Sequence, residues 1–279
     1  MKDVRGANAI VTGASKGIGV HIARALAKAG VNLSLAARSE AELEQVCTEM
    51  RAIGVKAIAT RCDVTVDADR TALLQHTRDE LGTLDILVNN AGVETVAHFE
   101  TADEDEIMRT IDVNLLAAVR LTRAVVPGFL ERKRGHVVNI ASGAGKIGVP
   151  FGVAYSTSKH GLVGLTHSLR CEYYGSPVGF SVVCPGFVSD TGMYARWEDN
   201  GVRAPAVAGR SSPEKVASVV VRCITHNRAE VIVNTPPVRP LIVLANIAPR
   251  VEPALMKLFG YTSVFRRVAD QVASGRGPA

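Results

Sequence analysis

Short apolar runs alternate with longer amphipathic stretches along the first 235 residues of the chain. The short runs are rich in Val, Ile, Leu and Ala, and most are followed by Gly, Pro, Asn or Asp, a pattern typical of buried strands. Between the runs, apolar residues recur at helical spacing. We expect strands over residues 7–11, 31–36, 56–61, 84–88, 135–141, 180–184 and 230–233.

The stretches between the runs predict helices, chiefly over residues 40–53, 67–81, 103–132 and 155–174. Asn114 interrupts the apolar face of the segment 103–132, because asparagine is a mediocre helix former and is costly to bury without partners. Residues 189–212 contain glycines, a proline and the only tryptophan, so we expect a loop that acts as a substrate lid. A chain of 279 residues suits one large α/β domain or two small ones.

A glycine-rich turn follows the first expected strand. Residues 12–19 form the pattern T-G-x-x-x-G-x-G, and helical spacing begins directly after them. Glycines let a phosphate approach the backbone, and the free amides and dipole of a helix N-terminus favour an anion. The spacing differs from the commoner G-x-G-x-x-G. The turn therefore predicts a phosphate site for a dinucleotide, formed around Gly13, Lys16, Gly17 and Gly19.

The residues after the second expected strand bear on which dinucleotide binds. An acidic residue about 20 positions after the glycines would hold the ribose 2′-OH of NAD. Ala37 and Arg38 stand there instead, so no carboxylate repels a 2′-phosphate and a guanidinium can bind one through two hydrogen bonds. Lys16 adds a second positive charge. Arg38 could also simply precede the next helix, but the pattern favours NADP over NAD.

Tyr155 and Lys159 are four residues apart on an expected helix, so the phenol and the ammonium lie on one face. A cation beside a phenol favours the phenolate, which brings tyrosine closer to the working range of a proton donor and acceptor. Ordinary helices often carry such a pair, so it indicates chemistry only with its surroundings. Residues 89–92, Asn-Asn-Ala-Gly, form either a plain turn or a ligand-binding end of a central strand.

Composition narrows the classes of function. The formal charge is +5, but no basic stripe with interleaved aromatics occurs, which gives a nucleic-acid role little support. The five cysteines are odd in number and form no C-x-x-C pair, which favours reduced thiols in a cytoplasmic setting and no metal site. The N-terminus is short and polar and does not resemble a signal peptide.

Together these motifs resemble the short-chain dehydrogenase/reductase family over roughly residues 5–235. The family's order and spacing are found in residues 12–19, Asp63, residues 89–92, Asn114, Ser142, Tyr155, Lys159, Pro185 and Gly186. The resemblance implies a single Rossmann-type, doubly wound α/β domain. It would contain a parallel sheet of about seven strands with helices on both faces, usually in a homodimer or homotetramer.

The resemblance also implies an NADP(H)-dependent oxidoreductase that interconverts a carbonyl and an alcohol. Tyr155 would give a proton to the carbonyl oxygen as hydride leaves the nicotinamide, and Ser142 would orient the carbonyl. Lys159 would lower the pKa of the tyrosine and hold the nicotinamide ribose. Asn114 would anchor a water that links Lys159 to solvent.

The same resemblance assigns the cofactor site. The dinucleotide would be lined by Gly13, Ser15, Ile18, Arg38, Asp63, Val64, Asn90, Ala91, Gly92, Pro185, Gly186, Val188 and Thr191, besides Tyr155 and Lys159. Related sequences often place a threonine five residues after the proline of Pro-Gly, whereas Thr191 stands six after Pro185. The contacts of Ser189, Asp190 and Thr191 therefore stay open.

Residues 236–279 are expected to form a helical extension, with an apolar run over 241–248 and an amphipathic segment over 250–267. The run is too short to span a bilayer. The extension could pack over the substrate pocket or a neighbouring subunit, or it could meet a membrane surface with its cations near headgroups. Some lipid- and steroid-metabolising members of the family look similar in this extension. This resemblance implies a mostly apolar substrate, such as a ketosteroid or a 3-oxoacyl compound. A non-catalytic dinucleotide-binding regulator is the alternative function.

Overall fold

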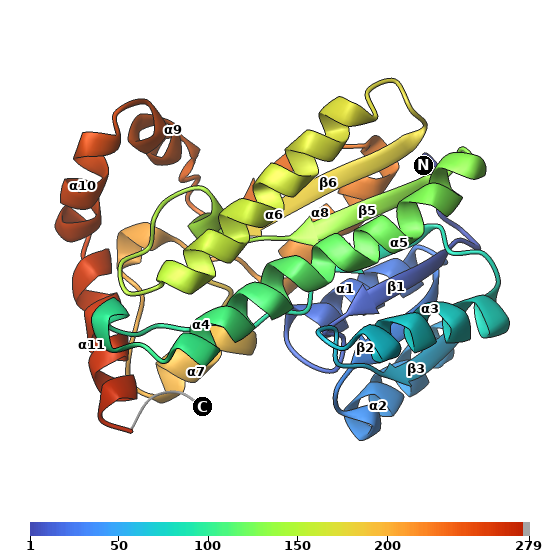
Figure 1. Ribbon diagram of the computed structural model, residues 1–279, viewed down its shortest axis with the longest axis horizontal. Coiled ribbons are helices and arrows are strands. Elements are labelled where there is room, and N and C mark those ends of the chain that lie inside the picture. The colour runs from blue at the N-terminus through green and yellow to red at the C-terminus, as the bar shows by residue number, and fades with distance from the viewer. Residues whose placement is uncertain (276–279) are drawn as a thin grey trace.

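The computed structural model describes residues 1–275, whose seven strands form one parallel sheet in the order β3-β2-β1-β4-β5-β6-β7 (Figure 1). Every pairing within the sheet is parallel. The strand order reverses between β1 and β4, which creates the crevice where doubly wound sheets bind ligands. The strands are β1 (Asn8–Thr12), β2 (Asn32–Ala37), β3 (Ala57–Arg61), β4 (Ile86–Asn89), β5 (Gly135–Ile140), β6 (Val178–Pro185) and β7 (Glu230–Val233).

Helices cover both faces of the sheet (Figure 1). Side chains alternate along a strand, so Ile10 and Val11 of β1 join different apolar clusters. One face packs against α1 (Ile18–Lys28), α2 (Glu40–Ile53) and α8 (Pro213–His226). The other packs against α3 (Asp67–Leu81), α5 (Ala117–Glu131) and α6 (Val153–Glu172). The expected fold class and the seven strands are confirmed.

The segment expected as one helix over residues 103–132 contains a change of helix type. It consists of α4 (Glu104–Ile111), a π-helical turn (Asp112–Leu116) and α5. The π turn contains Asn114, and such turns are frequent at functional sites. The continuous helical segment Glu104–Glu131 is long and apolar enough to cross a membrane, a test that the core helices of other proteins also pass. Leu121 and Phe129 of this segment are buried in the core.

The expectation of a loop throughout residues 189–212 was wrong, because α7 (Gly192–Asp199) lies within it. Glycines on both sides of this helix make the sequence look loop-like. Tyr194 and Trp197 nevertheless form a buried face on α7, and this face stabilises a helix of only two turns. Short 3-10 turns occur at Phe99–Thr101, Gly143–Gly145, Ala206–Ala208 and Pro249–Val251.

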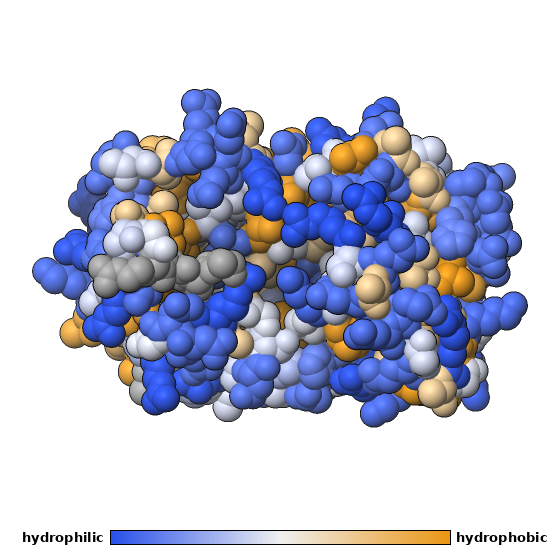
Figure 2. Space-filling view, turned by 90° about the horizontal axis from the view of Figure 1, so that it is seen from below, coloured by the Kyte–Doolittle hydropathy of each residue, from blue (hydrophilic) through white to orange (hydrophobic). Residues whose placement is uncertain are grey.

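The C-terminal extension forms α9 (Arg239–Ile247), α10 (Glu252–Leu258) and α11 (Tyr261–Ala273) at one end of the molecule (Figure 1). Gly260, with φ near +80°, separates α10 from α11, so the amphipathic stretch is two helices. Their apolar faces pack against α7 in one cluster. Polar contacts add to this packing, since Glu252 Oε1 accepts from Gly148 N at 2.6 Å and His98 Nε2 lies 2.8 Å from Asp270 Oδ1. The face of the molecule in Figure 2 is mainly hydrophilic.

Candidate active site

A cavity of about 720 Å³ opens at the edge of the sheet where β1, β4, β5 and β6 end. One half is lined by the glycine-rich turn and by residues after β2 and β3, and the other half by α7, α9 and α11. Of the expected site residues, the cavity wall includes Gly13, Ser15, Lys16, Gly17, Ile18, Arg38, Asp63, Val64, Asn90, Ala91, Gly92, Ser142, Tyr155, Lys159, Pro185, Gly186, Val188 and Thr191. Gly19 and Asn114 lie outside the wall.

The glycine-rich turn is too crowded for side chains. Gly13 has φ near +64°, and a Cβ there would lie 2.8 Å from the Cα of Ala91. A Cβ at Gly19 would lie 2.2 Å from the carbonyl oxygen of Gly13, so Gly19 serves close packing and not the wall itself. The turn leads directly into the N-terminus of α1. This cradle fits the diphosphate of a dinucleotide, because bare backbone amides and a helix dipole meet the cavity.

Asn90 fastens this turn to β4. Its side-chain nitrogen donates to the carbonyl oxygens of Thr12 at 2.9 Å and Gly13 at 3.0 Å. The backbone amides of Asn90 and Ala91 in turn donate to Thr12 Oγ1 at 3.0 Å. The Asn-Asn-Ala-Gly segment is therefore more than a plain turn, since it holds the phosphate cradle in shape.

The end of the cavity beside Arg38, where the adenosine of a dinucleotide would lie and which we call the adenosine end, combines the acids Glu42 and Asp63 with several cations. Asp63 Oδ1 accepts from Thr65 N at 2.9 Å and from Thr65 Oγ1 at 2.7 Å. Burial disfavours the ionised form of Asp63, but the bonds from Thr65 and the charges of Arg38 and Arg109 lower its pKa overall. Within residues 1–275, Arg38 forms no ion pair, so its donors are open to a phosphate. Sequence reasoning missed Arg109, which comes from α4 and has no local signal.

Three of the four expected catalytic side chains meet where the two halves of the cavity join. Ser142 follows β5, and its Oγ accepts from Ala144 N at 3.2 Å. Tyr155 and Lys159 lie on α6, with Lys159 Nζ 5.5 Å from the centre of the Tyr155 ring. Lys159 is buried and donates from Nζ to the carbonyl oxygen of Ile140 at 3.1 Å. Two further ammonium hydrogens remain for other partners.

Asn114 lies behind the cavity wall, in the π turn. Its Oδ1 accepts from Val93 N at 2.8 Å, and its Nδ2 donates to Val93 O at 2.9 Å and to Ser158 Oγ at 3.0 Å. A Cβ at Gly92 would lie 3.2 Å from Asn114 Oδ1 and 3.5 Å from Lys159 Nζ. The asparagine and the lysine are therefore neighbours across Gly92, and both amide hydrogens of Asn114 are already used.

Burial dominates the electrostatics of the site. Burial raises the pKa of Tyr155, the nearby Glu94 raises it further, and a hydrogen bond from Ser142 works in the opposite direction. Burial lowers the pKa of Lys159 to about 8, although Cys184 and Glu94 oppose the shift. In the protein alone, burial thus works against the expected lowering of the tyrosine pKa. Tyr155 is held in its protonated form, the form that donates.

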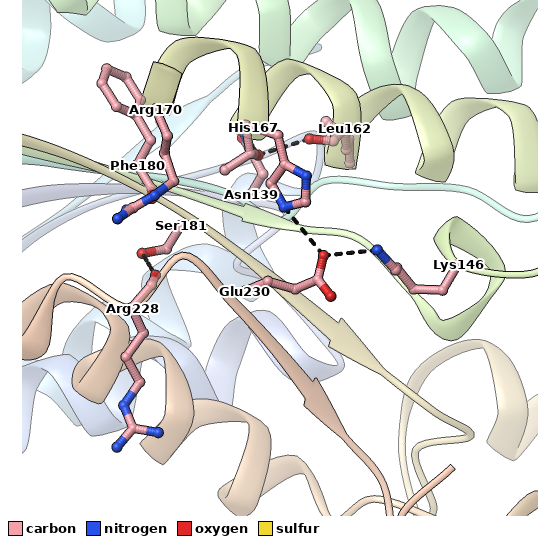
Figure 3. A network of polar contacts seen from close by, with 10 residues as sticks. Asn139, Lys146, Leu162, His167, Arg170, Phe180, Ser181, Arg228 and Glu230 are labelled. Atoms are coloured by element: carbon pink, nitrogen blue, oxygen red, sulfur yellow. Dashed lines mark hydrogen bonds and ion pairs between the residues drawn. The ribbon is translucent and has the colours of Figure 1, made fainter. Parts of the chain in front are cut away.

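A polar triad of Lys146, Glu230 and His167 holds the loop that carries Ser142 (Figure 3). Lys146 Nζ lies 2.9 Å from Glu230 Oε2, and His167 Nε2 lies 3.2 Å from the same oxygen. Lys146 follows the 3-10 turn after Ser142, Glu230 begins β7, and His167 lies on α6. The triad therefore connects the loop that carries Ser142 to the edge strand β7 and to α6, the helix of Tyr155.

The other half of the cavity is mostly apolar and aromatic. Its wall comes from residues within 94–96, 143–152 and 191–208, and also from the C-terminal helices. Sequence reasoning did not single out Phe187, Leu241, Ile242, Tyr261 and Phe265. It also missed the chemistry of Glu94, whose only signal is a carboxylate two residues after Asn-Asn-Ala-Gly. No group of His, Cys, Asp or Glu suited to a metal ion occurs among the described residues.

The chain is similar to several known reductases. Ketoacyl reductase HetN of a Nostoc species is 41% identical over 275 residues, which cover 97% of this chain and 95% of the relative. A putative ketoacyl reductase of the granaticin polyketide synthase of Streptomyces violaceoruber is 44% identical over 64% of this chain and 67% of its own.

Among solved structures, a variant of actinorhodin polyketide ketoreductase with NADPH is similar at a TM-score of 0.75 and 32% identity, over 82% of this chain and 95% of its own. A short-chain dehydrogenase/reductase from Burkholderia phymatum with NAD reaches a TM-score of 0.80 at 27% identity, over 90% of this chain and 96% of its own. The family model for short chain dehydrogenases matches residues 7–201. The chain is therefore a member of the short-chain dehydrogenase/reductase family.

Proposed function

We propose that the chain is an NADP(H)-dependent oxidoreductase that interconverts a ketone and an alcohol on a mostly apolar substrate. The observation that carries the proposal is the meeting of Ser142, Tyr155 and Lys159 at the boundary between a phosphate-binding half and an apolar half of one cavity. A reaction between a dinucleotide and an apolar molecule needs its proton donor at that boundary. The ketoacyl reductase names of the relatives support a carbonyl substrate.

The chemistry divides between the cofactor and the chain. The bound nicotinamide supplies the hydride that the carbonyl carbon accepts. Tyr155 donates its phenolic proton to the carbonyl oxygen, so an alcohol forms and a phenolate remains. Ser142 donates a hydrogen bond that orients the carbonyl. Lys159, charged at neutral pH with a pKa of about 8, stabilises the phenolate, and Asn114 holds the backbone of the adjoining wall.

The side chains at the adenosine end of the cavity favour NADP over NAD. Arg38 and Lys16 line the cavity there, and Ser39 stands at the N-terminus of α2 with no capping bond from its side chain. Two cations, a free hydroxyl and a helix N-terminus all favour a 2′-phosphate. The actinorhodin relative holds NADPH, whereas the Burkholderia relative holds NAD. Comparing kcat/KM for NADPH and NADH tests the preference, and a clear preference for NADH would overturn it.

Tyr155→Phe tests the mechanism. The phenylalanine keeps the ring but removes the proton, so turnover should fall by about 10²- to 10⁴-fold while NADPH binding, followed by cofactor fluorescence, is retained. Tyr174→Phe is the matched control, because Tyr174 is 92% exposed and lies at the far end of α6. Full activity of Tyr155→Phe would refute the mechanism.

The alternative is a regulatory protein that binds the dinucleotide without turning over a substrate. A panel of ketosteroids, 3-oxoacyl thioesters, quinones and simple ketones distinguishes the two, with NADPH oxidation as the readout. Binding of NADPH without turnover of any compound would favour the regulator. The pairing of Tyr155 with Lys159 at the boundary between the two halves of the cavity favours the enzyme, since a binding role does not require a proton donor there.

We further propose a cytoplasmic homodimer or homotetramer that contacts anionic membrane surfaces through α9 and α10. Ile247 and Leu258 are 78% and 75% exposed there, and Arg250 and Lys257 are exposed beside them. Apolar side chains flanked by cations suit a headgroup region. Flotation with phosphatidylglycerol vesicles should be reduced in an Ile247→Ser, Leu258→Ser variant but not in Phe99→Ser, and equal flotation would dismiss the contact. Light scattering after gel filtration gives the oligomeric state.

A further inference from the structure

Glu94 is a carboxylate in the apolar half of the cavity. It lies in the loop after β4 and lines the cavity together with Tyr155 and Trp197. Throughout residues 1–275 its carboxylate takes part in no ion pair, and the Trp197 indole is near enough to favour its ionised form. A carboxylate offers about four acceptor positions, so most of them have no partner in the chain. The catalytic mechanism above does not use this group.

The surroundings of Glu94 disfavour leaving its oxygens without donors. Burial raises the pKa of Glu94 to about 7, while Arg196, Trp197 and Lys159 favour the ionised form. Apolar and aromatic side chains form most of the remaining wall, including Val96 and Phe187. Glu94 is half-buried, and a carboxylate oxygen that a substrate covers without offering a hydrogen-bond donor loses its water and costs free energy. A substrate that brings a donor to this point therefore binds better than one that does not.

The charges around the carboxylate narrow the kind of donor. Lys159 and Arg196 are close enough to act on Glu94, so a cationic substrate group would meet two positive charges beside one negative charge. An anionic group would meet the carboxylate itself and the apolar wall. A neutral O–H group avoids both penalties, and it forms a charge-assisted hydrogen bond to the ionised acid.

We propose that Glu94 is a specificity-determining residue that accepts a hydrogen bond from a neutral hydroxyl group of the substrate, so that the favoured substrates are apolar hydroxyketones. The inference rests on the proposed ketone reduction and deepens it. The hydroxyl lies on the part of the substrate that faces α7, because Glu94 and Trp197 share that wall. The carbonyl faces Tyr155 on α6.

A purely structural role is the competing explanation, since Glu94, in the loop after β4, also lies near Trp197 of α7. Three variants separate the roles. Glu94→Leu removes the acceptor, and Glu94→Gln keeps a neutral acceptor of the same shape. Trp197→Phe changes the side chain of α7 near Glu94 but leaves the carboxylate in place.

The experiment measures kcat/KM with NADPH for matched pairs of ketones, each pair consisting of a plain ketone and the same skeleton with a hydroxyl at successive carbons. The wild-type protein should prefer one hydroxyketone over its plain partner. In Glu94→Leu that preference should fall by about 10- to 100-fold, through KM for the hydroxyketone, because hydrogen bonds to charged groups contribute this much. Glu94→Gln should fall between the two, and Trp197→Phe should keep the wild-type ratio.

Two failures are distinguishable. An unchanged ratio in Glu94→Leu, or an equal loss for both members of each pair, refutes the role of Glu94 while ketone reduction stands. A wild-type protein that binds NADPH and reduces no member of any pair refutes the proposed function and the inference with it.

Discussion

His136 makes the stability of the fold depend on pH. It lies on β5 between β4 and β6, with no exposed surface. Ser181 Oγ donates to the carbonyl oxygen of Arg228, so it accepts from His136 Nε2–H at 2.8 Å. The other ring nitrogen, Nδ1, is buried without a partner among the described residues. A proton on Nδ1 would find no acceptor.

The lowered pKa of His136 gives the magnitude and the sign of this pH dependence of the free energy of unfolding. Burial, together with the positive N-terminus and Arg170, lowers the pKa of His136 from 6.5 to about 3. Below pH 6.5 the unfolded chain therefore binds a proton that the folded chain does not, and the free energy of unfolding falls as pH drops towards about 3. At 1.36 kcal/mol per pKa unit, the loss is about 5 kcal/mol over this window, of which about 2 kcal/mol falls between pH 7 and pH 5.

Urea unfolding of the wild type and of His136→Gln at pH 7, 6 and 5 tests this reasoning. The variant should be less stable at pH 7, because packing around the ring is lost, but its disadvantage should shrink by about 2 kcal/mol at pH 5. Other titrating groups cancel in the difference between the two proteins. The same substitution at exposed His226 controls for loss of a histidine. Parallel pH profiles for wild type and His136→Gln would refute the argument.

Three further predictions concern the site. Arg38→Ala should lower kcat/KM for NADPH by about 10- to 100-fold and leave NADH nearly unchanged, since a charged hydrogen bond to the 2′-phosphate is lost. Gly145→Ala would place a Cβ 2.6 Å from the carbonyl oxygen of Lys159, so thermal unfolding should show a loss of about 1–3 kcal/mol and kcat should fall. Gly164→Ala, on α6 with open space around it, should instead stabilise by about 0.5–1 kcal/mol. Glu230→Gln should cost about 1 kcal/mol in urea unfolding, because the partly buried pair with Lys146 is broken.

The dinucleotide half of the molecule could be predicted from the sequence because its signals are local. Buried parallel strands read as continuous apolar runs, and the crowding that excludes side chains at Gly13 and Gly19 leaves glycines in the printed sequence. The pair Tyr155 and Lys159 is local as well, since helical spacing alone sets it on one face. Asn114 was expected to disturb a helix, and the structure accommodates it in a π turn.

The substrate half could not be predicted because its contacts are distant in sequence. The helix α7 is stabilised by Tyr194 and Trp197, which are buried in one cluster with Tyr261 and Phe265 of α11. The raised pKa of Glu94 likewise depends on burial by segments a hundred residues away. Arg109 reaches the adenosine end from a helix whose composition gives no hint of it.

Phe187 connects the dinucleotide half of the molecule to the substrate half. It directly follows Pro185-Gly186 at the end of β6, and its ring centre lies 5.0 Å from that of Tyr194, 6.4 Å from that of Tyr261 and 6.3 Å from that of Phe265. The edge of the sheet that bears the chemistry thus continues, through one aromatic cluster, into the C-terminal extension. A change in the extension therefore alters the shape of the substrate wall while leaving the phosphate cradle intact. Under the proposed function, changes in the extension therefore alter the choice of substrate and leave the choice of cofactor unchanged.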